Sequence, residues 1–153
     1  MKVTTVFNRN VTAYTKGVRV IVNKGSTRSS KTWSILQALC LIAEGSSSPL
    51  LISVVSESMP HLKKGCIRDF ETMLRTEKNW KHGAWNATDK VYRINDSVIE
   101  FFSADQPGKV HGPSRDILFV NECINIPFET YRQLAIRTPV SYTHLTLPTN
   151  SLV

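Results

Sequence analysis

The sequence has no apolar run near the roughly 20 residues of a membrane span, and it has little cysteine. Its first five residues, 1–5, lack the apolar core of a signal peptide. Cys40, Cys66 and Cys123 are odd in number and widely spaced, which argues against a disulfide framework or a zinc site. We therefore expect no membrane partner, a reducing compartment, and cysteines that serve as small buried apolar residues.

Charge is missing from one end of the chain. All 31 charged residues lie at or before Arg137, and the last sixteen residues contain none. The remainder is basic, with a net charge of +7, which permits a polyanionic partner. The 153 residues, 41% hydrophobic and 20% charged, predict one globular domain with a substantial core.

The main candidate site is a loop of small residues that joins a β-branched run to a long apolar helical pattern. It reads Lys24-Gly25-Ser26-Thr27-Arg28-Ser29-Ser30-Lys31-Thr32. Backbone N–H groups in such a loop, with a helix N-terminus, cradle phosphates. A loop of this kind is called a P-loop or Walker A motif. In that interpretation, Lys31 reaches the β- and γ-phosphates of ATP and the Thr32 hydroxyl binds Mg²⁺. Ser30 stands where the usual pattern has its second glycine, so a helix-capping turn with a solvated Lys31 is the alternative.

The order of elements predicts an α/β fold of the P-loop NTPase type. Strands are expected at 19–23, 50–56, 91–94, 97–102 and 116–120, and helices at 32–44, 58–77 and 128–137. This alternation is typical of a mainly parallel sheet covered by helices on both faces. Residues 1–18 have weak periodicity and are expected to be a surface lead-in.

Asn121 and Glu122 directly follow the last buried strand, as in a Walker B element. Ligands of parallel sheets bind beyond the carboxyl ends of the strands, where the 24–32 loop also lies. Asn121 is predicted to bind Mg²⁺ through water, and Glu122 to act as the general base for the attacking water. Arg28 could steady the γ-phosphate. The alternatives are a surface role for Glu122 and a solvated Arg28. The histidines form no metal-ligand spacing.

Four stretches together resemble the large terminase subunit of tailed bacteriophages, specifically its N-terminal ATPase half. The resemblance covers about residues 3–137 in order and spacing. The four stretches are the loop at 25–32, the passage from Val54-Val55 into 62–70, the segment 99–103 leading to Lys109-Val110-His111-Gly112, and Ile117-Leu118-Phe119-Val120-Asn121-Glu122-Cys123.

The resemblance implies ATP hydrolysis coupled to pumping duplex DNA into a procapsid. It implies ATP and Mg²⁺ as cofactors, and Lys31, Glu122 and Arg28 as the catalytic residues. The implied partners are duplex DNA, a small terminase subunit, the portal protein, and further copies in a ring, in the host cytoplasm. The nuclease domain of the family is absent from this sequence. The strand expected after 128–137 is absent too, so the sheet is expected to be incomplete at its C-terminal side.

Three other functions stay open at this point. A helicase-like P-loop ATPase shares the core fold, and the downstream sequence would distinguish it. A small-molecule kinase would need an acceptor site and a lid, for which the sequence has no candidate. A basic nucleic-acid-binding module would bind DNA in a salt-dependent way that is indifferent to ATP.

Residues 139–153 resemble the translation of a transposase-type sequencing adaptor rather than a protein element. The expected organisation is therefore a partial P-loop ATPase domain at 1–138 and a non-native tail at 139–153. The alternative is an uncharged β-rich strand that belongs to the protein.

Sequencing the source DNA across the codons near Thr138 tests the origin of this tail. We expect the genomic read to depart from the present sequence at about that codon. A contiguous genomic read that encodes residues 139–153 would contradict the adaptor origin.

Overall fold

The computed structural model describes residues 3–25, 31–138 and 142–148, the last stretch by its backbone alone. The α-helices are α1 (Thr5–Thr15), α2 (Lys31–Gly45), α3 (Met59–Leu62), α4 (Arg68–Thr76), α5 (Pro107–Val110) and α6 (Phe128–Ile136). The strands are β1 (Val20–Gly25), β2 (Leu51–Ser56), β3 (Trp85–Asn86), β4 (Val91–Ile94), β5 (Ser97–Ser103), β6 (Ile117–Val120) and β7 (Tyr142–Pro148). Short helical turns are the π-helix η1 (Lys63–Ile67) and the 3₁₀ turns η2 (His82–Ala84) and η3 (Cys123–Asn125).

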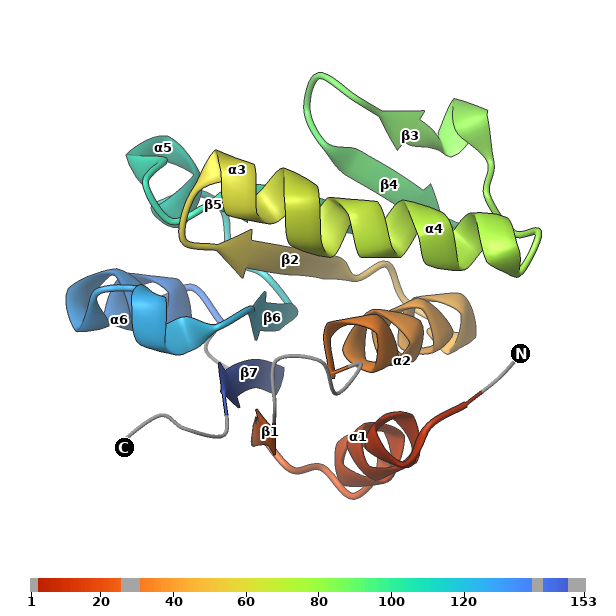
Figure 1. Cartoon of the computed structure of the whole chain (residues 1–153), viewed down its shortest axis with the longest axis horizontal. Helices are drawn as coiled ribbons and strands as arrows, with labels where there is room; N and C mark the ends of the chain where they lie inside the picture. The colour runs from red at the N-terminus through yellow and green to blue at the C-terminus, as the bar shows by residue number, and fades with distance from the viewer. Residues whose placement is uncertain (1–2, 26–30, 139–141, 149–153) are drawn as a thin grey trace.

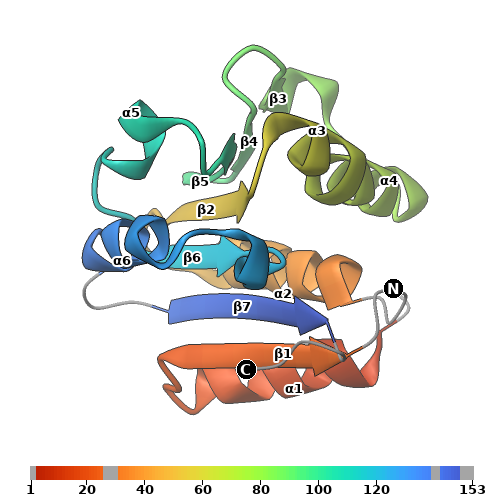
Figure 2. The ribbon, with the colours of Figure 1, turned by 60° about the vertical axis from the view of Figure 1, so that its left-hand side comes forward.

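The strands form one seven-stranded sheet in the order β1-β7-β6-β2-β5-β4-β3. Five neighbouring strands, β1, β7, β6, β2 and β5, run parallel to one another. β4 pairs antiparallel with β5, and β3 pairs antiparallel with β4 at the edge of the sheet. Figure 2 shows the parallel strands stacked one above the other. The predicted α/β fold of the P-loop type is confirmed, including the hairpin of β4 and β5.

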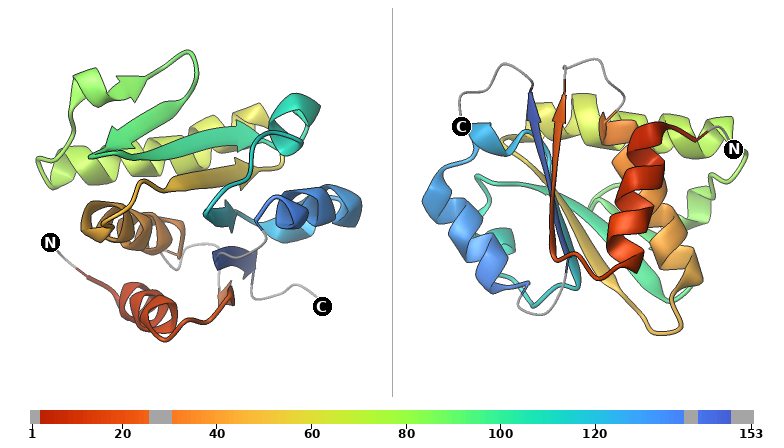
Figure 3. Two further views of the ribbon diagram at one scale, coloured as in Figure 1. Left: turned by 180° about the vertical axis from the view of Figure 1, so that it is seen from behind. Right: turned by 90° about the horizontal axis from the view of Figure 1, so that it is seen from below.

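Helices cover both faces of the sheet (Figures 1 and 3). α1, α2 and α4 lie on one face, and α5 and α6 lie on the other. The apolar faces predicted for the two long helices are buried. They consist of Leu36, Leu39, Cys40, Ala43, Leu62, Cys66, Phe70, Met73 and Leu74. Within the part of the chain that the structure describes, every helix is too short or too polar to span a membrane.

The helix expected at 58–77 is continuous but changes its winding. α3 passes through the π-helix η1 into α4. A π-helical turn is rare and often marks a functional site. Cys66 lies in this turn and is fully buried, and burial raises the pKa of its thiol to about 12. This thiol is therefore protonated at neutral pH and acts as a packed apolar group, as predicted.

The expectation of a surface lead-in at residues 1–18 is wrong. Residues 5–15 form α1, which packs against α2 and β1. Thr4 caps the helix by accepting a hydrogen bond from Phe7 N, and Phe7 is 6% exposed. The stretch is rich in Thr, Val and Asn, which have modest helix propensity, so contacts with the rest of the chain decide its conformation.

The expectation that the sheet lacks a strand after α6 is also wrong. β7 lies between β1 and β6 and pairs in parallel with both. Without β7, the facing edges of β1 and β6 would present unpaired N–H and C=O groups. An uncharged segment rich in Thr and Leu can supply both ladders whatever its origin, so the adaptor origin of 139–153 stays a prediction.

A buried arginine ties the sheet to α6. Arg115 is 2% exposed; its Nε donates to Ser53 Oγ at 3.0 Å and its guanidinium donates to Leu134 O at 3.0 Å. Ser53 Oγ in turn donates to Glu100 Oε1 at 2.6 Å. Burial lowers the pKa of Arg115, and the charge of Glu100 acts in the opposite direction. These bonds connect β2, β5 and α6 through Arg115, which lies two positions before β6.

Replacing Arg115 by methionine tests this connection. We expect Arg115→Met to lower the free energy of unfolding by about 3 kcal/mol, because it leaves buried polar groups of Ser53 and Leu134 without their donor. Urea unfolding followed by circular dichroism measures the change. Arg132→Met is the matched control, since Arg132 forms an exposed pair with Glu129, and it should leave the free energy of unfolding nearly unchanged. Equal losses in the two variants would contradict the role of Arg115.

Candidate nucleotide site

The predicted site residues gather at the carboxyl ends of three parallel strands. Gly25 ends β1, Ser56 ends β2, and Asn121 directly follows β6. Parallel strands place these ends at one edge of the sheet, as Figure 2 shows. α2 begins at the same edge with Lys31. The prediction that the 24–32 loop and Asn121-Glu122 both lie at carboxyl ends of strands is therefore confirmed for the described residues.

The Lys31 ammonium reaches back across the loop. Its Nζ donates to Gly25 O at 2.7 Å, so the first residue of α2 is bonded to the last residue of β1. Burial lowers the pKa of Lys31, while the negative charge of Glu122 raises it. The bond to Gly25 O holds this amino group beside the start of α2, where its positive charge would stabilise an anion.

One hydrogen bond joins the two halves of the site. Thr32 Oγ1 donates to Asn121 Oδ1 at 3.1 Å, although the two residues are 89 positions apart. Asn121 is itself fixed to the sheet, because its backbone N–H donates to Val55 O at 2.9 Å. The bond therefore holds the first turn of α2 against the end of β6.

The hydroxyl of Thr32 and the amide oxygen of Asn121 are oxygen ligands of the kind that a magnesium ion takes, directly or through water. Within 3–25, 31–138 and 142–148, no three His, Cys, Asp or Glu side chains group as a metal site. An ion here would therefore take most of its ligands from phosphates and water, as Mg²⁺ usually does.

Glu122 adopts a left-handed backbone conformation, with φ at +52°. This conformation costs a residue with a side chain about 1–2 kcal/mol, and such strain is concentrated at functional sites. It turns the chain sharply from β6 into η3. The carboxylate lies close enough to Lys31 and Cys66 to influence the pKa of both. It lines a small pocket with Ser56, Glu57, His61, Asn121 and Asn125.

Five predicted phosphate-binding residues lie outside the described part of the chain. They are Ser26, Thr27, Arg28, Ser29 and Ser30. Their roles, including that of Arg28 at the γ-phosphate, stay predictions.

Several neighbours of the site were not predicted from the sequence. Ser56 lies at a strand end, so the same rule that identified Asn121 could have found it. His61 forms a hydrogen bond of 2.6 Å with Ser58 Oγ and lies 3.5 Å from Glu57 Oε1. Gly65 in η1 lies against Asn121, because a Cβ added there would be 4.0 Å from Asn121 Nδ2. Only the tertiary structure brings this π-helical turn to the site.

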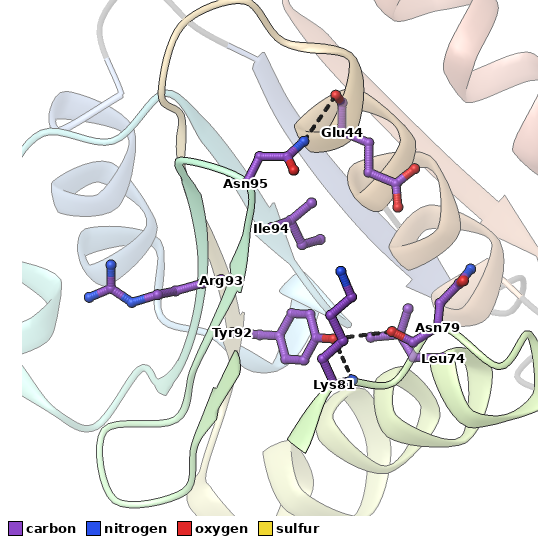
Figure 4. A pocket seen from close by; sticks show the side chains of 8 residues that line it. All are labelled: Glu44, Leu74, Asn79, Lys81, Tyr92, Arg93, Ile94 and Asn95. Carbon is purple, nitrogen blue, oxygen red and sulfur yellow. Dashed lines mark hydrogen bonds between the residues drawn. The ribbon is translucent and has the colours of Figure 1, made fainter. Parts of the chain in front are cut away.

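A larger pocket, of about 320 Å³, lies at the opposite edge of the sheet. Figure 4 shows it between the ends of α2 and α4 and strand β4. Lys81 N donates to Tyr92 Oη at 3.0 Å, and Asn95 donates to Glu44 O at 3.4 Å. This pocket lies away from the carboxyl ends of the parallel strands, where ligands of such sheets bind, so it is not the nucleotide site.

Comparison with solved structures identifies proteins with the same fold. No protein-family model matches the sequence, and no curated protein sequence matches it. The large terminase of a thermophilic bacteriophage matches 96% of this chain, with a TM-score of 0.79 and 13% identity. The same terminase solved with ADP and with ATP-gamma-S matches with TM-scores of 0.70 and 0.73, at 16% and 14% identity.

Two further structures match with lower scores. The large terminase ATPase domain of Thermus phage P74-26 has a TM-score of 0.59 and 12% identity, over 88% of this chain and 61% of that domain. The Phi-28 gp11 DNA packaging motor has a TM-score of 0.52 and 12% identity, over 84% of this chain and 46% of that one. This chain spans 39% of the thermophilic phage terminase. It has the fold of the ATPase domain of bacteriophage large terminases.

Proposed function

We propose that this chain binds Mg-ATP and hydrolyses it as part of a motor that packages phage DNA. The observation that carries the proposal is the bond between Thr32 and Asn121, which joins a Lys-Thr helix start to a strand end followed by Glu122. The fold adds support, because the thermophilic phage terminase with this fold has been solved with ADP and with ATP-gamma-S.

Four described residues of the site have a role in this chemistry. Lys31 binds phosphate oxygens, and its position at the start of α2 adds the helix dipole to its charge. Thr32 and Asn121 would hold Mg²⁺, with Asn121 acting through water. The ion would neutralise charge on the phosphates. Glu122 orients the attacking water and accepts its proton.

Two substitutions separate binding from hydrolysis. Lys31→Ala should abolish ATP binding, because it removes the cation that binds the phosphates. Glu122→Gln should retain binding but lower kcat by about 10²-fold or more, because an amide cannot accept the proton. Calorimetric titration with ATP-gamma-S and a phosphate-release assay measure the two effects.

Matched controls remove an equivalent charge elsewhere. Lys16→Ala removes a positive charge at the exposed end of α1. Glu71→Gln removes a negative charge from an exposed ion pair with Arg75. Both controls should bind and hydrolyse ATP as the unaltered chain does. Unchanged turnover in Lys31→Ala or in Glu122→Gln would refute the assignment of that residue.

Duplex DNA is the proposed polyanionic partner. The stretch from residue 63 to residue 81 carries six basic and three acidic side chains. Its basic residues are all exposed and are Lys63, Lys64, Arg68, Arg75, Lys78 and Lys81. Two of the acids are engaged locally, Glu71 with Arg75 and Glu77 with Gln37. An excess of exposed positive charge along this helical stretch attracts phosphate backbones without reading base sequence.

Reversing two of these charges tests DNA binding. The double variant Lys64→Glu and Arg68→Glu should weaken DNA binding by at least tenfold in roughly 50 mM salt and flatten its salt dependence. Fluorescence anisotropy with a labelled duplex measures both. Arg132→Glu, on α6 at the other face of the sheet, is the control and should have little effect. Equal DNA affinity in the double variant and the unaltered chain would overturn the role of this helix surface.

The same function implies partners that belong to this proposal. They are further copies of the chain in a ring, a small terminase subunit, and the portal protein of the procapsid. The site of action would be the host cytoplasm, with the motor docked on the procapsid.

A further inference from the structure

Helix α1 contacts both elements that flank the phosphate loop. β1 ends at Gly25 on one side of the loop, and α2 begins at Lys31 on the other. α1 packs against both of them, and Figure 3 shows it alongside α2 on the same face of the sheet. Two sets of hydrogen bonds, one to each element, accompany this packing.

The first set is a reciprocal amide pair with β1. Asn10 Nδ2 donates to Asn23 Oδ1 at 2.8 Å, and Asn23 Nδ2 donates to Asn10 Oδ1 at 2.9 Å. Asn10 Nδ2 also donates to Val6 O at 2.7 Å, within α1. Asn10 is 1% exposed, so water cannot easily replace these bonds. Two antiparallel bonds between planar amides fix orientation as well as distance, and Asn23 lies two residues before the end of β1.

The second set links the start of α1 to the start of α2. Thr4 Oγ1 lies 2.6 Å from Ser34 Oγ, and it also accepts a hydrogen bond from Phe7 N. Ser34 is fully buried and lies three residues after Lys31, in the first turn of α2. The cap of α1 is therefore bonded to the turn that carries Lys31 and Thr32.

From these contacts we infer that α1 is a strap that holds the two ends of the phosphate loop in position for the nucleotide. The inference rests on the proposed function, and it makes Asn10, Asn23, Thr4 and Ser34 positioning residues. A loop that binds phosphate must hold its donors in place before the ligand arrives, since ordering them afterwards reduces affinity. Apolar packing alone is non-directional, whereas buried amide and hydroxyl pairs specify one arrangement.

Nucleotide affinity in a double-mutant cycle tests the amide pair. The full chain and its variants Asn10→Ala, Asn23→Ala and the double variant are titrated with Mg-ADP. Either single change removes both reciprocal bonds, so each should raise Kd about tenfold, or about 1.4 kcal/mol. The double variant should then bind scarcely more weakly than the single variants.

Two controls separate positioning from general stability. Ile99→Val removes one methylene from the buried core away from the loop and should lower stability modestly. Thr15→Ala removes an exposed hydrogen bond to Val11 O on the same helix. Both should keep the Kd of the unaltered chain. If Asn10→Ala does not fold, Thr4→Val takes its place in the test. It removes the hydrogen bond to Ser34 and should also raise Kd.

The outcomes are distinct. A raised Kd in the strap variants, with unchanged Kd in both controls, supports the inference. If the unaltered chain binds Mg-ADP and the strap variants bind it equally well, the inference is overturned while the proposed function stands. If the unaltered chain does not bind Mg-ADP, the proposed function fails and the inference fails with it.

Discussion

The bond between Thr32 and Asn121 is the contact on which the proposed site depends. The two residues are 89 positions apart in the sequence, and Thr32 Oγ1 lies 3.1 Å from Asn121 Oδ1. The parallel sheet makes this possible, because parallel strands end at one edge and the loops that follow them meet there. β2 contributes as well, since its Val55 carbonyl holds the backbone of Asn121. Lys31 and Glu122 then bring opposite charges to the same edge.

Other parts of the fold keep this edge in place. α2 is buried along most of its length, so Lys31 and Thr32 begin a helix that cannot shift without disturbing the core. Arg115 fixes α6 to the sheet on the other face. The left-handed backbone of Glu122 fits this pattern, because a strained residue persists only where its surroundings determine its conformation.

Regular patterns allowed much of the fold to be predicted. The buried strands, the apolar face of α2 and the placement of Asn121 follow from periodicity and from the strand-end rule. α1 could not be predicted, because Thr4 and Asn10 stabilise it through partners far along the chain. Arg115 stands in a loop sequence, where charge is normally exposed, so only the tertiary structure explains its burial. The π-helical turn of η1 has no compositional signal either.

Hydrogen–deuterium exchange of the whole chain, with and without Mg-ADP, is the most direct test of the nucleotide site. The nucleotide should slow amide exchange at residues 31–33 and at residues 121–122 together, because both stretches face the same ligand. Exchange around Lys81 and Tyr92, in the pocket at the opposite edge of the sheet, should stay unchanged. Protection at that pocket alone, or no protection anywhere, would contradict the account.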